Sequence, residues 1–191
     1  MSIQSNDNHI NQQNFRHILH CFSHPGEKRE LLINNKSTLT ASIWQFILVT
    51  CDNSMTVYID ADLLNDQLKE SFLLYCPIKL SDDIQSADFV IINKENITED
   101  LLNQLNVGTR ISPEQSSTLL INCVNHNEIE SQLMSFSGPG VDGSKSFQIP
   151  LLPDFLWQWR AQIEFPLGVD IVLCDEFSIQ AIARSTTINK I

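Results

Sequence analysis

The sequence is short of positive charge. Its 191 residues contain 12 Lys and Arg against 23 Asp and Glu, which gives a formal net charge of −11. Such an acidic chain repels phosphate backbones, so we do not expect a nucleic acid as its partner. A small phosphorylated ligand remains open, because a few converging arginines can bind it within a distant negative field. The arginines available for such a site are Arg16, Arg29, Arg110, Arg160 and Arg184.

Cysteine is also sparse, and its spacing follows no metal-binding or disulfide pattern. The chain has five cysteines, and no two of them form a Cys-x-x-Cys pair. This argues against a zinc ribbon, an iron–sulfur cluster and a disulfide framework. It fits reduced thiols in a cytosol, so we predict a cytoplasmic protein. The cysteines are Cys21, Cys51, Cys76, Cys123 and Cys174.

Long apolar runs are missing as well. The best candidate, residues 43–51, has about half of the roughly 18 residues that a membrane helix requires, and it carries a Gln. The opening residues 1–14 have neither a basic segment nor an apolar stretch, so we do not expect a secretory signal. With 42% apolar and 18% charged residues, the composition is that of a soluble globular domain.

Helical and extended patterns alternate along the first half of the chain, and a β-rich stretch follows Gly108. This order predicts a three-layer α/β sandwich with a mixed sheet. We expect one domain over 14–191 behind a flexible N-terminus at 1–13. The expected strands are 29–34, 55–60, 87–93, 117–124, 131–138, 144–150 and two within 168–175 and 177–184. The expected helices begin near Phe15, Ser37 or Thr38, Asp60 or Asp62, Thr98 and Pro153.

The stretch His17-Ile-Leu-His-Cys-Phe-Ser-His24 holds three histidines and a cysteine at helical spacing, and two of these side chains could ligate zinc. Against this, His24 precedes Pro25 and is expected to leave the shared face. No nearby Asp or Glu is spaced to orient an imidazole. We expect the opposite stripe to be core and the histidine face to be solvated or to meet a partner. The cluster is His17, His20, Cys21 and His24, and the stripe is Phe15, Ile18, Leu19 and Phe22.

Three further motifs suggest chemistry only weakly. Cys123 with His126 could form a nucleophile–base pair, but adjacency in sequence supplies neither a lowered thiol pKa nor a positioned base. Residues 138–143 match Gly-x-Gly-x-x-Gly, but strand-like residues follow where a dinucleotide loop needs a helix. We predict a turn between two antiparallel strands there. Lys145 is expected to be exposed rather than a Schiff-base lysine. We therefore expect no cofactor and no catalytic residue of this chain's own.

Several segments together resemble the PhnH subunit family of the bacterial carbon–phosphorus lyase core complex. The most specific are "FPLGVDIVL" (165–173) and "AIARSTTI" (181–188). Three further segments agree with the family pattern and occur in the same order along the chain. They are Phe15-Arg16 followed by Ser23-x-Pro-Gly26, "GTRISPEQSSTLL" (108–120) and the "GPG" loop (138–140). The resemblance spans about residues 14–188.

The resemblance implies a role in organic phosphonate catabolism. The complex, with PhnG, PhnI and PhnJ, uses ATP and an alkylphosphonate to displace adenine and form a ribose 1-phosphonate 5-triphosphate. It further implies a cut-down large domain of a pyridoxal-phosphate transferase without the cofactor, a homodimer, and an auxiliary role that meets ATP or phosphonate through the complex. A small phosphate-ligand binding module and a metal-dependent stand-alone enzyme remain alternatives.

Two arginines are candidates for a phosphate site. Arg184 ends a predicted strand beside Thr186, and Arg16 lies near the Ser23-x-Pro-Gly turn. A guanidinium with hydroxyls or turn amides can bind phosphate or phosphonate. The favoured alternative for these arginines is a structural one, in which an arginine bonds carbonyls or pairs with Asp170 or Glu164. Two arrangements of Trp157 and Trp159 are equally open. In one, a tryptophan lies in the core and the other at an interface; in the second, both are partly buried in the monomer core.

Overall fold

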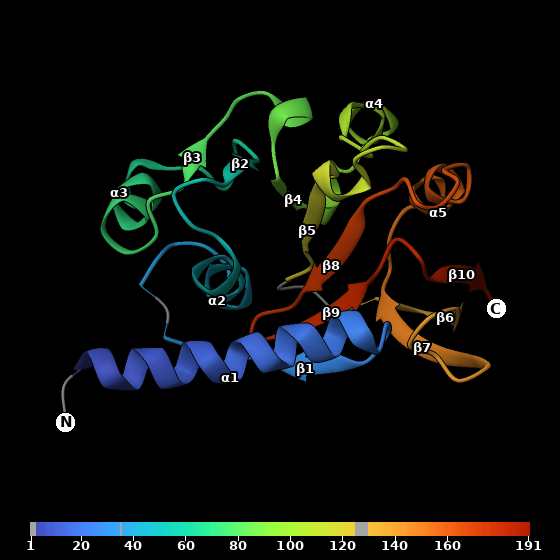
Figure 1. The fold of residues 1–191 in the computed structure, drawn as a ribbon, viewed down its shortest axis with the longest axis horizontal. Coiled ribbons are helices and arrows are strands. Elements are labelled where there is room, and N and C mark those ends of the chain that lie inside the picture. Colours follow the sequence, from blue (N-terminus) through green and yellow to red (C-terminus); the bar gives the residue numbers. More distant parts are fainter. Residues whose placement is uncertain (1–2, 35, 125–129) are drawn as a thin grey trace.

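The computed structural model describes residues 3–34, 36–124 and 130–191, and it is an α/β fold with a large mixed sheet and a small antiparallel sheet (Figure 1). The large sheet has the order β1-β9-β8-β5-β4-β2-β3. Strands β3, β2, β4, β5 and β8 run parallel, and β9 and β1 run antiparallel to their neighbours. The strands are β1 (Lys28–Glu30), β2 (Thr56–Ile59), β3 (Lys79–Leu80), β4 (Phe89–Asn93), β5 (Thr118–Asn122), β8 (Asp170–Cys174) and β9 (Ser178–Ile182).

Alternate residues of the central strands enter two separate cores. In β4, Ile91 packs into one hydrophobic cluster, while Val90 and Ile92 pack into the other. Both faces of the sheet are therefore covered, which is why residues 89–92 of this strand are all apolar. The first cluster is covered by α1 (Ile3–Ser23), α2 (Ala41–Thr50) and α3 (Asp66–Tyr75).

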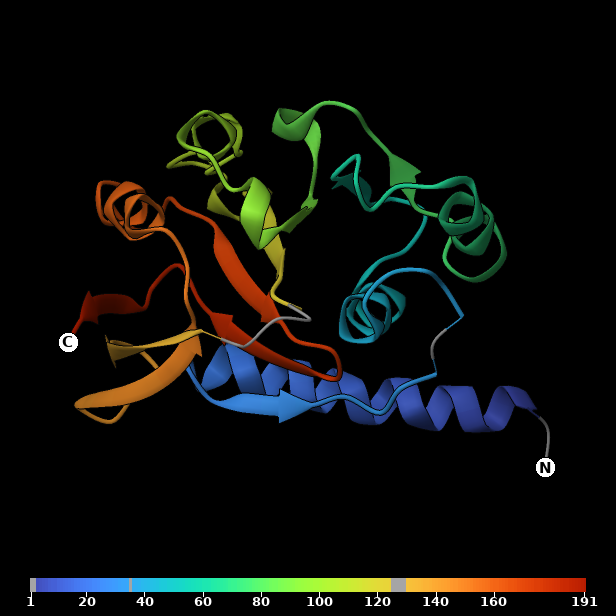
Figure 2. The ribbon, with the colours of Figure 1, turned by 180° about the vertical axis from the view of Figure 1, so that it is seen from behind.

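The second face carries two helices and the small sheet (Figure 2), so the expected α/β fold with a mixed sheet is confirmed. Its helices are α4 (Glu99–Gln104) and α5 (Asp154–Ala161). The small sheet has the order β10-β6-β7, with β6 (Ser131–Ser137), β7 (Ser144–Pro150) and β10 (Thr187–Lys190). The described part of the chain also contains 3-10 turns at Ile84–Ser86, Lys94–Asn96 and Pro113–Gln115.

Most of the predicted helices and strands are present, but many of them begin or end at other residues than predicted. The Thr98 side chain caps α4 by accepting a hydrogen bond from the Leu101 amide, as predicted. The cap of α3 is Asn65 rather than Asp60 or Asp62. Helix α1 begins at Ile3 rather than near Phe15. Strands β3 and β10 were not predicted, because β3 has two residues and β10 has one apolar residue among four, so neither sets a pattern.

The buried face of α1 differs from the predicted stripe. Ile18 and Cys21 are buried, but Phe15 is 47% exposed and Leu19 is 52% exposed. In their place Asn14 is fully buried, where its amide donates to the Leu32 carbonyl at 2.8 Å and to the Gln45 side chain at 3.0 Å. A polar side chain can occupy a core position when its hydrogen bonds are satisfied, and this rotates the helix away from its most apolar face. Among the described residues, no helix has the length and apolarity needed to cross a membrane.

Candidate functional site

Sequence segments that lie far apart in the chain pack together around the end of β9. The Gly168 amide donates to the Val107 carbonyl, and the Gly26 amide donates to the Ala181 carbonyl. A Cβ on Gly138 would lie 2.9 Å from the Ser185 carbonyl oxygen, so the 138–140 loop touches the 184–187 turn. The same loop touches the end of α1, because a Cβ on Gly140 would lie 2.1 Å from the Ser23 carbonyl oxygen. The motif segments of the sequence therefore form one contiguous region of the fold.

Arg184 is the side chain that ties this region together. Its backbone amide donates to Asp170 Oδ1 at 2.7 Å, and its guanidinium lies 3.5 Å from Asp170 Oδ2. The guanidinium also donates to the Pro113 carbonyl and, at 2.7 Å, to Ser116 Oγ. The structural alternative is thus present in part: Arg184 pairs with Asp170, whereas Glu164 pairs with Arg110 at 2.8 Å.

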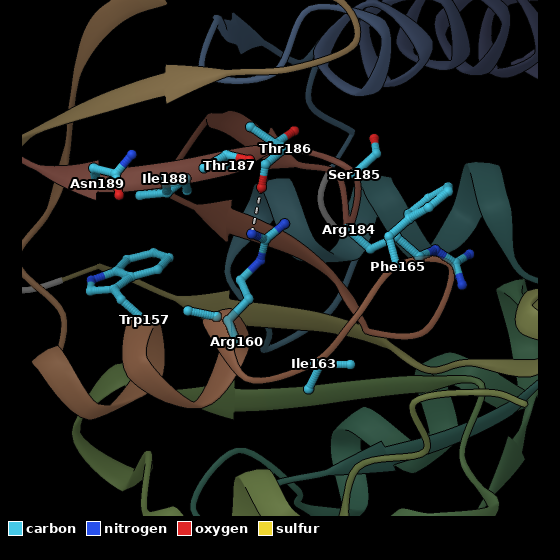
Figure 3. Close-up of a pocket in the computed structure, with 11 residues that line it drawn as sticks. Trp157, Arg160, Ile163, Phe165, Arg184, Ser185, Thr186, Thr187, Ile188 and Asn189 are labelled. Carbon is cyan, nitrogen blue, oxygen red and sulfur yellow. Dashed lines mark hydrogen bonds between the residues drawn. The ribbon is translucent and has the colours of Figure 1, made fainter.

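A cavity of about 280 Å³ lies between α5 and the chain from Arg184 to Asn189 (Figure 3). Its wall contains Arg184 and Thr186 of the predicted site, together with an arginine that the sequence did not single out, Arg160. Aromatic and aliphatic side chains complete it. The lining residues are Trp157, Arg160, Ala161, Ile163, Phe165, Arg184, Ser185, Thr186, Thr187, Ile188 and Asn189.

Arg160 reaches from α5 to the turn between β9 and β10. Its guanidinium donates to the Thr186 carbonyl at 2.6 Å (Figure 3). It also donates to the Ala183 carbonyl. Its Nε atom and the hydroxyl of the buried Thr186 have no hydrogen-bond partner among the described residues. Burial lowers the pKa of Arg160 to about 10, against the opposing effect of Asp170. The only sequence signal was its i, i+3 relation to Trp157, which places both on one helix face.

Arg16 does not join these residues. It is exposed on α1, which covers the first face of the large sheet, whereas α5 lies on the second face (Figure 1). The structure therefore brings together Arg184 and Thr186 but separates Arg16 from both.

The chain as a whole, rather than this region alone, matches a known protein family. The profile of the family described as "Bacterial phosphonate metabolism protein (PhnH)" matches residues 4–189. The chain belongs to the PhnH family. It is similar to the "Putative C-P lyase subunit protein HtxG" of Stutzerimonas stutzeri, with 25% identity over 93% of this chain and 85% of that protein. It is also similar to the "Alpha-D-ribose 1-methylphosphonate 5-triphosphate synthase subunit PhnH" of Rhizobium meliloti (strain 1021), with 24% identity over 94% of this chain and 90% of that protein.

The histidine cluster of this PhnH-family chain is held by neighbouring charges. His20 Nε2 lies 2.6 Å from Glu27 Oε2 and 2.6 Å from Arg29 Nη2. The expectation that no carboxylate orients an imidazole was therefore wrong, because the turn after α1 returns Glu27 to His20. The hydrogen bond from His20 is the main reason why the pKa of Glu27 lies below its usual value. The expectation that His24 leaves the face was also wrong, since its ring stacks on that of His20 with centroids 4.2 Å apart.

The remaining predicted features have clear places in the PhnH fold. Residues 138–143 belong to the connection of the antiparallel β6–β7 hairpin, as predicted, and Lys145 is exposed. Trp157 and Trp159 are both half-buried against the second cluster. His126 lies outside the described residues. Among the described residues, no three His, Cys, Asp or Glu side chains are grouped to hold a metal ion.

The thiols of this PhnH-family chain are expected to be unreactive in the native state. Burial raises the pKa of Cys21 from an ordinary 9.0 to about 11, and it raises the pKa of Cys51 and Cys123 to about 12. Because burial favours the neutral thiol, each buried thiol makes its full contribution to the stability of the native state at a pH below its ordinary pKa. That contribution is lost as the pH rises through the raised pKa of the native protein. At about pH 8, a disulfide reagent should label the native protein very slowly but label all five thiols in guanidinium chloride. Rapid labelling of a native thiol would contradict this.

Proposed function

We propose that this chain is the PhnH subunit of a carbon–phosphorus lyase core complex. In that complex it supports the displacement of adenine from ATP by an alkylphosphonate, which gives a ribose 1-phosphonate 5-triphosphate. The observation that carries the proposal is the PhnH family match over residues 4–189. The name of the Rhizobium relative, a subunit of a ribose 1-methylphosphonate 5-triphosphate synthase, supports the specific reaction.

We propose an auxiliary rather than a catalytic role within the complex. The described thiols support it, because all of them are free, and burial raises their pKa and disfavours the nucleophilic thiolate. His20 supports it too, since its Nε2 lies 2.6 Å from the Glu27 carboxylate and is engaged there. Arg184 bonds Asp170 and the Pro113 carbonyl, which is the pattern of a residue that holds segments together.

The proposed partners are a second copy of this chain and the subunits PhnG, PhnI and PhnJ, in the cytoplasm. Exposed apolar side chains support partner binding, because such side chains gather at interaction surfaces. Phe15 and Leu19 lie one turn apart on α1, and Leu73 and Leu74 protrude from α3. The mixed sheet with its parallel centre is compatible with a shortened pyridoxal-phosphate-transferase domain, which we propose as its origin.

Co-expression of this chain with PhnG, PhnI and PhnJ tests the proposal. Size-exclusion chromatography with light scattering is expected to show a single large assembly that contains this chain. Omitting the chain is expected to abolish formation of ribose phosphonate from ATP, and adding it back should restore the activity. As a control, the Arg110→Ala variant of this chain is added back in place of the wild type. The exposed ion pair that this variant loses lies outside the cavity. Full activity of a PhnG–PhnI–PhnJ preparation without this chain would contradict the proposal.

A further inference from the structure

Strand β6 of the small sheet directs alternate residues at its two neighbours, β7 and β10. In an antiparallel sheet, the backbone N–H and C=O of successive residues point alternately to the two sides of a strand. The Leu151 amide donates to the Glu130 carbonyl at 2.9 Å, and the β6–β7 register continues this pairing through the even-numbered residues of β6. The odd-numbered residues Ser135 and Ser137 therefore direct their backbone groups at β10.

Strand β10 consequently has an unpaired outer edge. The two serines lie opposite Asn189 and Thr187, so these two residues of β10 bond β6. The backbone N–H and C=O of Ile188 and Lys190 point away from β6. No other described residue bonds these four groups. Because Ile188 lines the cavity beside α5, part of this edge faces the cavity (Figure 3).

The other long edges of the two sheets are blocked in ways that proteins use against strand pairing. On β7, the Gln148 carbonyl accepts a hydrogen bond from the Gln180 side chain, and Pro150 has no N–H to offer. Strand β1 consists of three exposed charged residues, and the His17 ring lies 2.6 Å from the Glu30 carbonyl. The edge of β10 has neither kind of block within the described chain.

Helix α5 lies along the free edge of β10 and is joined to it at both ends. Lys190 Nζ lies 2.9 Å from Asp154 Oδ1 at the start of α5, and Arg160 near its end donates to the Thr186 carbonyl. The eight residues of α5 rise about 12 Å, which corresponds to about three or four residues of a strand. The cavity of about 280 Å³ therefore suits a short extended segment.

The two ends of the cavity differ in how firmly they are closed. The Lys190 and Asp154 side chains are 60% and 59% exposed, and an exposed pair of this kind opens at little cost. The Arg160 guanidinium is held by the Thr186 and Ala183 carbonyls. A chain that enters past Lys190 thus has to end before Arg160. This favours a chain terminus over an internal segment.

The closed end is also the positive end. The cavity lining includes Arg160 and Arg184 but no carboxylate, although the whole chain has a net charge of −11. Arg184 is paired with Asp170, whereas no described carboxylate lies within ion-pair distance of Arg160. An antiparallel neighbour of β10 would run from the Lys190 end toward the Thr186 end. Its carboxyl terminus would then meet the uncompensated charge of Arg160.

We propose that this cavity binds the carboxyl-terminal residues of a partner protein, which add to β10 as a fourth strand of the small sheet. Their backbone bonds the outward groups of Ile188 and Lys190, and the terminal carboxylate lies at the Arg160 end. An apolar side chain of the segment packs against Trp157 (Figure 3). In strand addition, main-chain bonds supply affinity and side-chain pockets supply specificity. The inference rests on the strand edge and the cavity, and it is independent of the proposed function.

A display library of random heptapeptides with free carboxyl termini, selected on the full chain, tests this inference. An enriched peptide is synthesised as the free acid and as the carboxyl-terminal amide. The acid is expected to bind saturably in titration calorimetry, and the amide about tenfold more weakly, because it lacks the charge that faces Arg160. The peptide should slow hydrogen exchange of the Ile188 and Lys190 amides, whereas Thr187 and Asn189 should be protected with or without it.

Two variants of Lys190 isolate the strand edge. Lys190→Pro removes the outward N–H, and Lys190→Gln keeps it while losing the same ion pair with Asp154. Since that N–H has no partner in the free chain, the two variants should unfold at about the same temperature. The proline variant should bind the peptide about tenfold more weakly than the glutamine variant, because one hydrogen bond is lost and the ring obstructs the edge.

Three results would overturn the inference: no enriched peptide, unprotected Ile188 and Lys190 amides in the presence of the peptide, or equal affinities of the two Lys190 variants. Equal binding of the acid and the amide would overturn the assignment to a chain terminus. All of these measurements use this chain alone. Their failure is therefore distinguishable from failure of the complex to assemble, which bears on the proposed function.

Discussion

Arg184→Ala is expected to lower the free energy of unfolding by about 3 kcal/mol. The substitution removes the guanidinium from Asp170, from the Pro113 carbonyl and from Ser116. The Arg184 and Asp170 side chains are only 22% and 19% exposed, so water replaces these bonds poorly. Asp170 keeps its hydrogen bond from the backbone amide of residue 184, which places the effect at the lower end for a broken buried pair. Urea unfolding followed by tryptophan fluorescence measures it.

Arg110→Ala is the matched control for this prediction. Arg110 and Glu164 are closer, at 2.8 Å, but their side chains are 75% and 79% exposed. An exposed ion pair contributes about 0–1 kcal/mol, so this variant should unfold almost as the wild type does. The burial of the Arg184–Asp170 pair and the number of hydrogen bonds that Arg184 makes then account for the larger loss of unfolding free energy. The distance between the charged atoms does not account for it. Equal effects of the two substitutions would show that Arg184 does not hold the motif segments together.

The parts of the fold that follow from local pattern could be predicted from the sequence. The apolar run 87–93 is typical of a strand covered on both faces, and it contains β4, an inner strand of the large sheet. For Arg184 the sequence offered carbonyls or a pair with Asp170 or Glu164, and the structure has the carbonyl and Asp170 as partners. Only the strand follows from residues near one another in sequence.

The features that depend on tertiary contacts could not be predicted. The burial of Asn14 depends on Gln45 and on the Leu32 carbonyl, and it leaves Phe15 exposed. Arg160 in its helix had the pattern of a surface residue, and only the turn between β9 and β10 gives it carbonyls to bond. Sequence periodicity says which residues share a face, but it does not say which face a neighbouring element covers.

Gly140→Ala is expected to destabilise the protein by at least about 3 kcal/mol. Gly140 has a φ of +83°, a conformation that costs a residue with a Cβ about 1–2 kcal/mol. In addition, the new methyl group would lie 2.1 Å from the Ser23 carbonyl oxygen, which is backbone and cannot rotate away. The hairpin loop would have to separate from the end of α1. Thermal unfolding followed by circular dichroism measures the loss.

Gly143→Ala in the same hairpin connection separates the two causes. Gly143 also has a positive φ, +68°, but a Cβ there would meet no atom within 4 Å. This variant should therefore lose only the conformational part, about 1 kcal/mol. If both variants lost the same amount, the contact between the 138–140 loop and Ser23 would contribute nothing. A much larger loss for Gly140→Ala would show that close backbone packing joins these two motif segments, and that the glycine is required by the contact as well as by the turn.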